Sequence, residues 1–152
     1  MSVRDILANI MILALTLVLV GCNRSETLTK LADIDPEGWN GSKPCRIVVA
    51  NEDTVRLSDI SFIFRYDESY DNSLDSLTVR ITTPDTLWYQ ERIATPLSRK
   101  QTTNTGFYED SVPYRQNVRL SSRGEYIFEL SPAGGNATGI WGAGVMVTPV
   151  KD

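Results

Sequence analysis

The chain has 152 residues, a formal net charge of −4 at pH 7 and no histidine. A mildly acidic chain lacks the concentrated Lys and Arg that nucleic-acid binding requires, so we expect no nucleic-acid partner. Without histidine, Ser-His-Asp and Cys-His triads are excluded, as is the commonest transition-metal ligand. The length is that of one domain with a single core.

The first segment in chain order is an uncharged apolar stretch over residues 10–20. It has about half of the ~20 residues that a membrane-spanning helix needs, which is typical of the apolar core of a signal peptide. It ends in the motif Leu19-Val20-Gly21-Cys22, which matches the lipobox of bacterial lipoproteins. The Cys22 thiol is the group that a diacylglyceryl donor alkylates, and Gly21 leaves the scissile carbonyl open to the signal peptidase.

These features predict a signal peptide over residues 1–21, cleavage between Gly21 and Cys22, and a covalent diacylglycerol and N-acyl (palmitate) lipid on Cys22. The alternative is an ordinary signal peptide whose cysteine forms a disulfide. Asn23 stands where an aspartate commonly retains lipoproteins in the inner membrane, and residues 24–27 lack the acidic cluster of surface-exported lipoproteins. We therefore expect a lipid-anchored protein of the outer membrane that faces the periplasm. With Cys22 acylated, Cys45 has no disulfide partner and is expected to be a buried small hydrophobe.

Residues 22–36 are polar and without a period, and they predict a lipid-anchored tether ahead of a domain over residues 37–152. Within that domain apolar and polar residues alternate, as they do in half-buried strands of antiparallel sheets. The alternation covers residues 60–65, 77–82, 126–130 and 141–147, and an apolar run begins at Cys45. Trp141 falls on the apolar face of the last segment and is expected to lie in the core.

Turn signals separate these segments at Pro84-Asp85, Thr105-Gly106, Val112-Pro113, Arg123-Gly124 and residues 132–135. No sustained helical period interrupts them. We predict an all-β fold, a single antiparallel β-sandwich of about eight strands, with jelly-roll or immunoglobulin-like topology left open. Gly142 and Gly144 alternate along the last strand, where a neighbouring backbone can approach closely.

Candidate binding residues are aromatic and acidic. Residues 67–75 are the densest acidic stretch, and its oxygens could hold Ca²⁺, although the spacing is not that of an EF-hand and a solvated loop is favoured. We expect no metal and no cofactor other than the lipid. A candidate carbohydrate-binding face comprises Trp39, Trp88, Asp67, Glu68 and Asp71; the alternative is that the aromatic residues pack in the core. A carboxylate pair could act as a glycosidase dyad without histidine, but exposed carboxylates are the commoner case, so we predict no catalytic residue and no enzyme.

Four triplets share the form Asp, hydroxyl residue, aliphatic residue, which is an O-glycosylation acceptor pattern of exported bacterial proteins. Their hydroxyl residues are Thr54, Ser76, Thr86 and Ser111. A polar turn residue that enters an alternating strand also produces this triplet, so glycosylation is a hypothesis beside that simpler explanation.

The sequence resembles the GldH family of gliding-motility lipoproteins over most of the mature chain. The resemblance rests on Pro36-Glu37-Gly38-Trp39, Phe64-Arg65, Tyr70, Leu74, Pro84-Asp85, Tyr114, Val118, Leu120, Gly124-Glu125-Tyr126-Ile127-Phe128, Gly139-Ile140, Gly142, Gly144-Val145 and Val147. It implies an outer-membrane lipoprotein associated with gliding motility and its linked protein-secretion apparatus, in which no catalytic residue is known. We therefore expect a non-catalytic structural or interaction component with other cell-envelope proteins as partners. The alternative is a lipid-anchored carbohydrate- or glycan-binding module.

Overall fold

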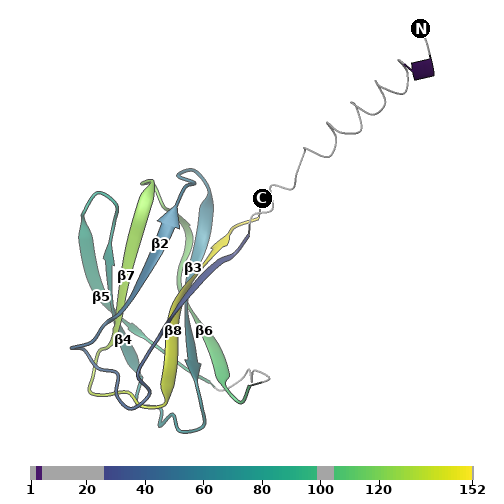
Figure 1. Cartoon of the computed structure of the whole chain (residues 1–152). Helices are drawn as coiled ribbons and strands as arrows, with labels where there is room; N and C mark the ends of the chain where they lie inside the picture. Colours follow the sequence, from purple (N-terminus) through teal and green to yellow (C-terminus); the bar gives the residue numbers. More distant parts are fainter. Residues whose placement is uncertain (1–2, 5–25, 99–104, 152) are drawn as a thin grey trace.

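The computed structural model describes residues 3–4, 26–98 and 105–151 (Figure 1). The predicted cleavage and lipid-attachment residues, Gly21 and Cys22, lie outside this part of the chain. Among the described residues, no helix has the length and apolar character needed to cross a membrane.

The described chain folds into eight strands, which form two four-stranded antiparallel sheets (Figure 1). They are β1 (Leu28–Asp33), β2 (Cys45–Asn51), β3 (Leu57–Tyr66), β4 (Ser76–Thr82), β5 (Trp88–Ala94), β6 (Tyr108–Arg119), β7 (Gly124–Pro132) and β8 (Ile140–Pro149). One sheet has the order β1-β8-β3-β6 and the other β2-β7-β4-β5. The predicted β-sandwich is confirmed, and this strand order is that of a jelly roll, which decides the topology that the sequence left open.

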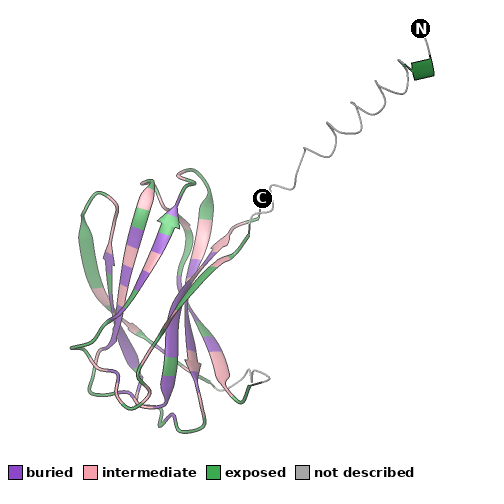
Figure 2. Ribbon diagram, viewed as in Figure 1, coloured by how far each residue is buried: buried purple, intermediate pink, exposed green. Residues whose placement is uncertain are grey.

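The core lies between the two sheets and is built from alternate residues of their strands (Figure 2). Phe62 of β3 meets Phe128 of β7 across the sandwich, with ring centroids 6.3 Å apart in an edge-to-face arrangement. Cys45 at the start of β2 is buried, as predicted, and its thiol points toward the carbonyl oxygen of Ala143 at 3.8 Å. Burial, with a smaller contribution from the charge of Asp33, raises the pKa of this thiol to about 11.

The predicted tether is wrong over residues 28–33, because these residues form strand β1. β1 pairs with β8, so Leu31 lies opposite Gly144 and Asp33 lies opposite Gly142. A Cβ atom on Gly144 would overlap the backbone of Lys30, which confirms the predicted close approach at this glycine, whereas one on Gly142 would make an ordinary contact with Ala32 at 3.4 Å. The folded domain therefore begins about ten residues earlier than position 37.

Two further predictions fail for reasons of strand register. Val112-Pro113 is not a turn: both residues lie within β6, an edge strand that proline tolerates because one side of it has no ladder partner. Pro113 also lies beside a register shift in the pairing with β3.

The second is the burial of Trp141, which is not in the core but 40% exposed. The reason is an extra residue in β8, where Tyr66 pairs with Ile140 and Arg65 pairs with Gly142. This β-bulge turns Trp141 outward.

The loops gather at the two ends of the sandwich. The N-terminal end, as we call it, comprises Glu26 and residues 52–56, 83–87, 120–123 and 150–151, and the distal end comprises residues 34–44, 67–75 and 133–139 (Figure 1). The predicted turns at residues 84–85, 123–124 and 132–135 fall at these strand ends.

Candidate interaction surfaces at the two ends of the sandwich

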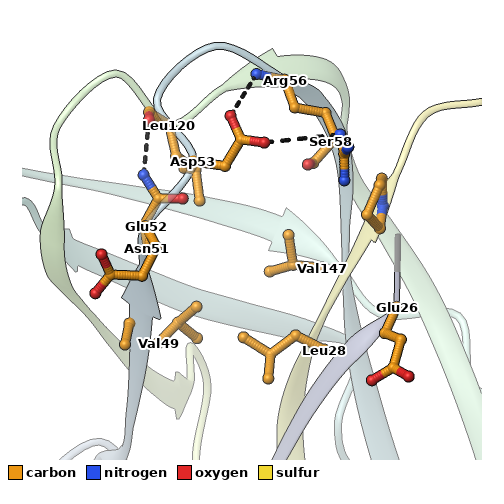
Figure 3. A pocket seen from close by; sticks show the side chains of 12 residues that line it. Glu26, Leu28, Val49, Asn51, Glu52, Asp53, Arg56, Ser58, Leu120 and Val147 are labelled. Atoms are coloured by element: carbon orange, nitrogen blue, oxygen red, sulfur yellow. Dashed lines mark hydrogen bonds and ion pairs between the residues drawn. The ribbon is translucent and has the colours of Figure 1, made fainter. Parts of the chain in front are cut away.

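A shallow cavity of about 240 Å³ opens at the N-terminal end (Figure 3). Leu28, Val49 and Val147 form its apolar floor, while polar side chains surround its mouth. Asn51 donates from Nδ2 to the carbonyl oxygens of Leu120 at 2.8 Å and Ser122 at 3.0 Å, which ties strand β2 to the β6–β7 loop. The cavity therefore lies between the start of β1 and the loops beside it.

The β2–β3 loop is held by Asp53. Its Oδ1 accepts hydrogen bonds from the backbone N–H groups of Val55 at 2.9 Å and Arg56 at 3.0 Å, and Oδ2 lies 3.7 Å from Nε of Arg56. The backbone hydrogen bonds from Arg56 and Val55 lower the pKa of the Asp53 carboxyl. This turn directs the Val55 side chain outward, where it is 73% exposed.

The β4–β5 hairpin presents a second apolar tip at the same end. Leu87 and Trp88 are 67% and 59% exposed. The Arg80 guanidinium lies over the Trp88 ring, 4.5 Å from its centroid, so one face of the indole is occupied by a cation. Together with Val55, these are the three most exposed large apolar side chains of the domain over residues 26–98 and 105–151.

The distal end is more tightly packed. The acidic β3–β4 loop is not simply solvated, because Tyr70 and Leu74 within it are buried. The Tyr70 hydroxyl accepts a hydrogen bond from the Leu74 amide at 3.2 Å, and the Asp67 amide donates to the Gly139 carbonyl at 3.1 Å. Gly139 has φ +77°, and a Cβ atom there would overlap the backbone of Tyr70, so this contact between two loops requires glycine.

Trp141 is the large exposed apolar residue at the distal end. Its indole N–H donates to Oδ2 of Asp67 at 2.6 Å, and its ring meets Phe107 edge-to-face at 5.7 Å. Asp67 also accepts hydrogen bonds through Oδ1 from the backbone and hydroxyl of Ser69. Burial acts to raise the pKa of Asp67, but the hydrogen bonds from Ser69 and Trp141 together outweigh it and lower the pKa. The result is a positioned aromatic side chain beside a charged carboxylate.

The structure does not bring together the predicted carbohydrate-binding face. Trp39 is 2% exposed and packs against Phe64, because its backbone forms a bridge to Ala137 that draws the side chain into the core. Trp88 lies at the N-terminal end, whereas Asp67, Glu68 and Asp71 belong to the loop at the distal end. The residues predicted for the glycan-binding alternative therefore do not form one face.

The carboxylate oxygens of the acidic loop also accept hydrogen bonds from groups within the same loop. Asp71 Oδ1 accepts from the Ser73 backbone at 3.0 Å, and the pKa of Asp71 is lowered mainly by hydrogen bonds from Ser73. In the described part of the chain, no group of three or more cysteine or carboxylate side chains is arranged to hold a metal ion. The alternating sequence pattern placed Trp141 in the core and so missed its exposure, which depends on the β-bulge where β8 pairs with Arg65 and Tyr66.

The four hypothetical glycosylation sites differ in access. Ser76 is buried, and its hydroxyl is engaged by Asp75 and by the Arg92 guanidinium at 2.6 Å. Thr54 is half-buried, whereas Thr86 and Ser111 are exposed. The hypothesis is therefore better founded for Thr86 and Ser111. The intact mass of protein from the native host tests it, since a mass equal to polypeptide plus lipid contradicts it.

A jelly-roll domain that follows a lipobox defines a class of protein, the lipid-anchored β-sandwich proteins of the bacterial envelope. Within that class, the GldH lipoprotein family model matches residues 26–138, and the chain belongs to this family. The matched range begins before β1, in agreement with the corrected start of the domain. No curated protein matches the chain.

The chain is also similar to solved structures that are distant in sequence. The Yersinia pseudotuberculosis-derived mitogen is 11% identical with a TM-score of 0.40, and 84% of this chain matches 89% of that one. Pseudomonas aeruginosa AlgX is 17% identical with a TM-score of 0.43, and 91% of this chain matches 30% of that one. For the infectious bursal disease virus VP2 subviral particle the identity is 12% and the TM-score 0.33, with 84% of this chain matching 34% of that one.

Proposed function

We propose that this GldH-family lipoprotein is a non-catalytic structural or interaction component of the outer membrane. It is anchored through lipid on Cys22, faces the periplasm and serves gliding motility and the linked protein-secretion apparatus through contacts with other envelope proteins. Family membership supports the association with motility. The observation that carries the proposal is Trp141, an exposed aromatic side chain fixed at the end of the domain farthest from the N-terminal segment.

Interfaces between proteins commonly depend on a few aromatic side chains that are held in place before the partner arrives. Trp141 fits this description, since the Asp67 carboxylate and the Phe107 ring fix it from two sides. By contrast, the lowered pKa values of Asp67 and Asp71 do not suit a glycosidase acid, whose pKa must be raised to keep its proton. The chemistry of the distal end thus supports binding rather than catalysis.

Affinity capture of the detergent-solubilised full-length lipoprotein tests the partner surface. The native protein should retain a defined set of envelope proteins, and Trp141→Ala should lose them while it remains folded. Trp88→Ala is the matched control, because Trp88 is also an exposed tryptophan and lies at the opposite end. Equal retention of partners by both variants would contradict the role of Trp141.

The anchor is tested separately by Cys22→Ala. This variant should remain unprocessed or become soluble, because the thiol is the acceptor of the diacylglyceryl group. If the variant still fractionates as the mature protein with the outer membrane, the lipid attachment is wrong. Gene deletion should impair colony spreading or protein secretion if the protein serves that machinery.

A further inference from the structure

We propose that the N-terminal end of the sandwich rests on the membrane and inserts Val55, Leu87 and Trp88 into the lipid interface. This inference rests on the proposed lipid anchor at Cys22 and adds to it a fixed orientation of the domain. The β2–β3 loop and the β4–β5 hairpin are then membrane-contacting loops, and Trp141 points away from the bilayer.

The first argument is the length of chain between the lipid and the domain. Glu26 is the first described residue at this end, and it lines the cavity together with Asp53 and Arg56. The four residue steps from Cys22 to Glu26 span at most about 14 Å even when fully extended. Because β1 starts at Leu28 and is paired with β8 from its first residue, the link cannot lengthen without loss of that strand. This end of the sandwich is therefore kept at the membrane surface.

The second argument is that the loops at this end form one connected surface. Asn51 bonds to the β6–β7 loop, and Arg123 of that loop lies 3.5 Å from Glu52 of the β2–β3 loop. Gly124 lies against the Pro84 ring, which links the same loop to the β4–β5 hairpin. The loops that carry Val55 and Leu87 are therefore linked to each other through the β6–β7 loop.

The third argument is the kind of side chain that these loops expose. Val55, Leu87 and Trp88 are the most exposed large apolar residues of the described domain. Tryptophan is favoured at membrane–water interfaces because its ring is apolar and its N–H is polar. An apolar side chain at a loop tip gains free energy when it leaves water for the acyl boundary.

The charges at this end indicate which lipids it suits. Glu26, Glu52, Asp53 and Asp85 stand beside Arg56, Arg123 and Lys151, so neither sign dominates. A basic patch for anionic lipid is lacking among these residues. We infer a zwitterionic surface as the partner, and we expect contact that changes little with salt concentration.

Depth-dependent quenching of tryptophan fluorescence tests this orientation. The mature lipoprotein is extracted with its lipid and reconstituted in phosphatidylethanolamine–phosphatidylcholine vesicles that carry a nitroxide on the acyl chain near the headgroup. The emission of Trp88 is obtained as the difference between the native protein and Trp88→Phe, and that of Trp141 from Trp141→Phe. Trp88 should lose most of its emission and shift to the blue, while Trp141 should be unaffected. The double variant Val55→Asp, Leu87→Asp should stay on the vesicles through its lipid and recover Trp88 emission.

The outcomes separate the orientation from the anchor. Vesicle-bound protein with unquenched Trp88, or with Trp88 and Trp141 quenched alike, would overturn the orientation and leave the anchor standing. Protein that does not float with vesicles overturns the anchor and the orientation with it. A glycan found on Thr86 of protein from the native host would also overturn the orientation, since it would hold Leu87 away from the bilayer.

Discussion

The two ends of the sandwich differ in how their loops are built. At the distal end, loops pack against each other through buried side chains, with Tyr70, Leu74 and Trp39 among the core residues. At the N-terminal end, the loops are short turns held by polar contacts of Asp53 and Asn51, and the apolar side chains at their tips are exposed on the domain. A rigid end with one positioned aromatic suits a protein partner, whereas apolar tips on short turns suit a lipid surface.

The largest effect is expected from Gly139→Ala at the distal end. The added Cβ would overlap the Tyr70 backbone, and alanine is strained at φ +77°. We expect a loss of about 3 kcal/mol in the free energy of unfolding, measured by urea denaturation. Gly134→Ala is the control, since nothing lies within 4 Å of the added atom, and it should change stability by less than about 0.5 kcal/mol. Equal effects of the two substitutions would show that the distal loops are not tightly packed.

A matched pair of tyrosines compares the two ends directly. The Tyr70 hydroxyl accepts from the buried Leu74 amide, and the Tyr126 hydroxyl accepts from the Ser122 amide at 3.1 Å at the N-terminal end. Tyr70→Phe should cost about 2 kcal/mol, because a buried amide is left without a partner. Tyr126→Phe should cost less than about 1 kcal/mol, because Ser122 is half-exposed and water can replace the hydroxyl. A larger cost for Tyr126→Phe in thermal unfolding would reverse the comparison.

A gain in stability is expected at the N-terminal end. Thr86 has φ +67° in the β4–β5 hairpin, at a position that glycine or asparagine usually occupies. Thr86→Gly should therefore raise the free energy of unfolding by about 1 kcal/mol. Asn72→Gly at the distal end is the control, because asparagine already tolerates φ +61°. If Thr86→Gly destabilises the protein, the threonine side chain makes a contact that compensates for the strain.

Strands β3, β4, β7 and β8 could be predicted because each carries its own alternation of apolar and polar residues. β1 could not, since Leu28 and Leu31 show no period of two and the strand is defined by its pairing with β8, where Gly144 leaves room for the backbone of Lys30. Such a pairing joins residues more than a hundred positions apart and leaves no local signal.

The candidate surfaces were harder to predict than the fold. A one-residue bulge reverses which residues of a strand face the core, so the exposure of Trp141 cannot be inferred from its spacing. The burial of Trp39 depends on its bridge to Ala137 at the far end of the chain. Trp39 and Trp141 at the distal end are thus placed by long-range pairing, whereas Cys45 and strands β3, β4, β7 and β8 follow from local pattern.

The smallest effect is expected in an acid titration of tryptophan fluorescence, which distinguishes the two exposed tryptophans. The pKa of Asp67 lies below its ordinary value of 3.8, so the charged carboxylate stabilises the fold at neutral pH. That contribution is present above the pKa of the unfolded chain and is lost as the pH falls through the lower pKa of the folded state. Trp141 emission should therefore change with a midpoint below pH 3.8, and Asp67→Asn should abolish the change. Trp88 is the comparison, because its ring lies against the Arg80 guanidinium at the N-terminal end and not against Asp67. A common midpoint for both tryptophans would indicate global acid unfolding instead of a local event at the distal end.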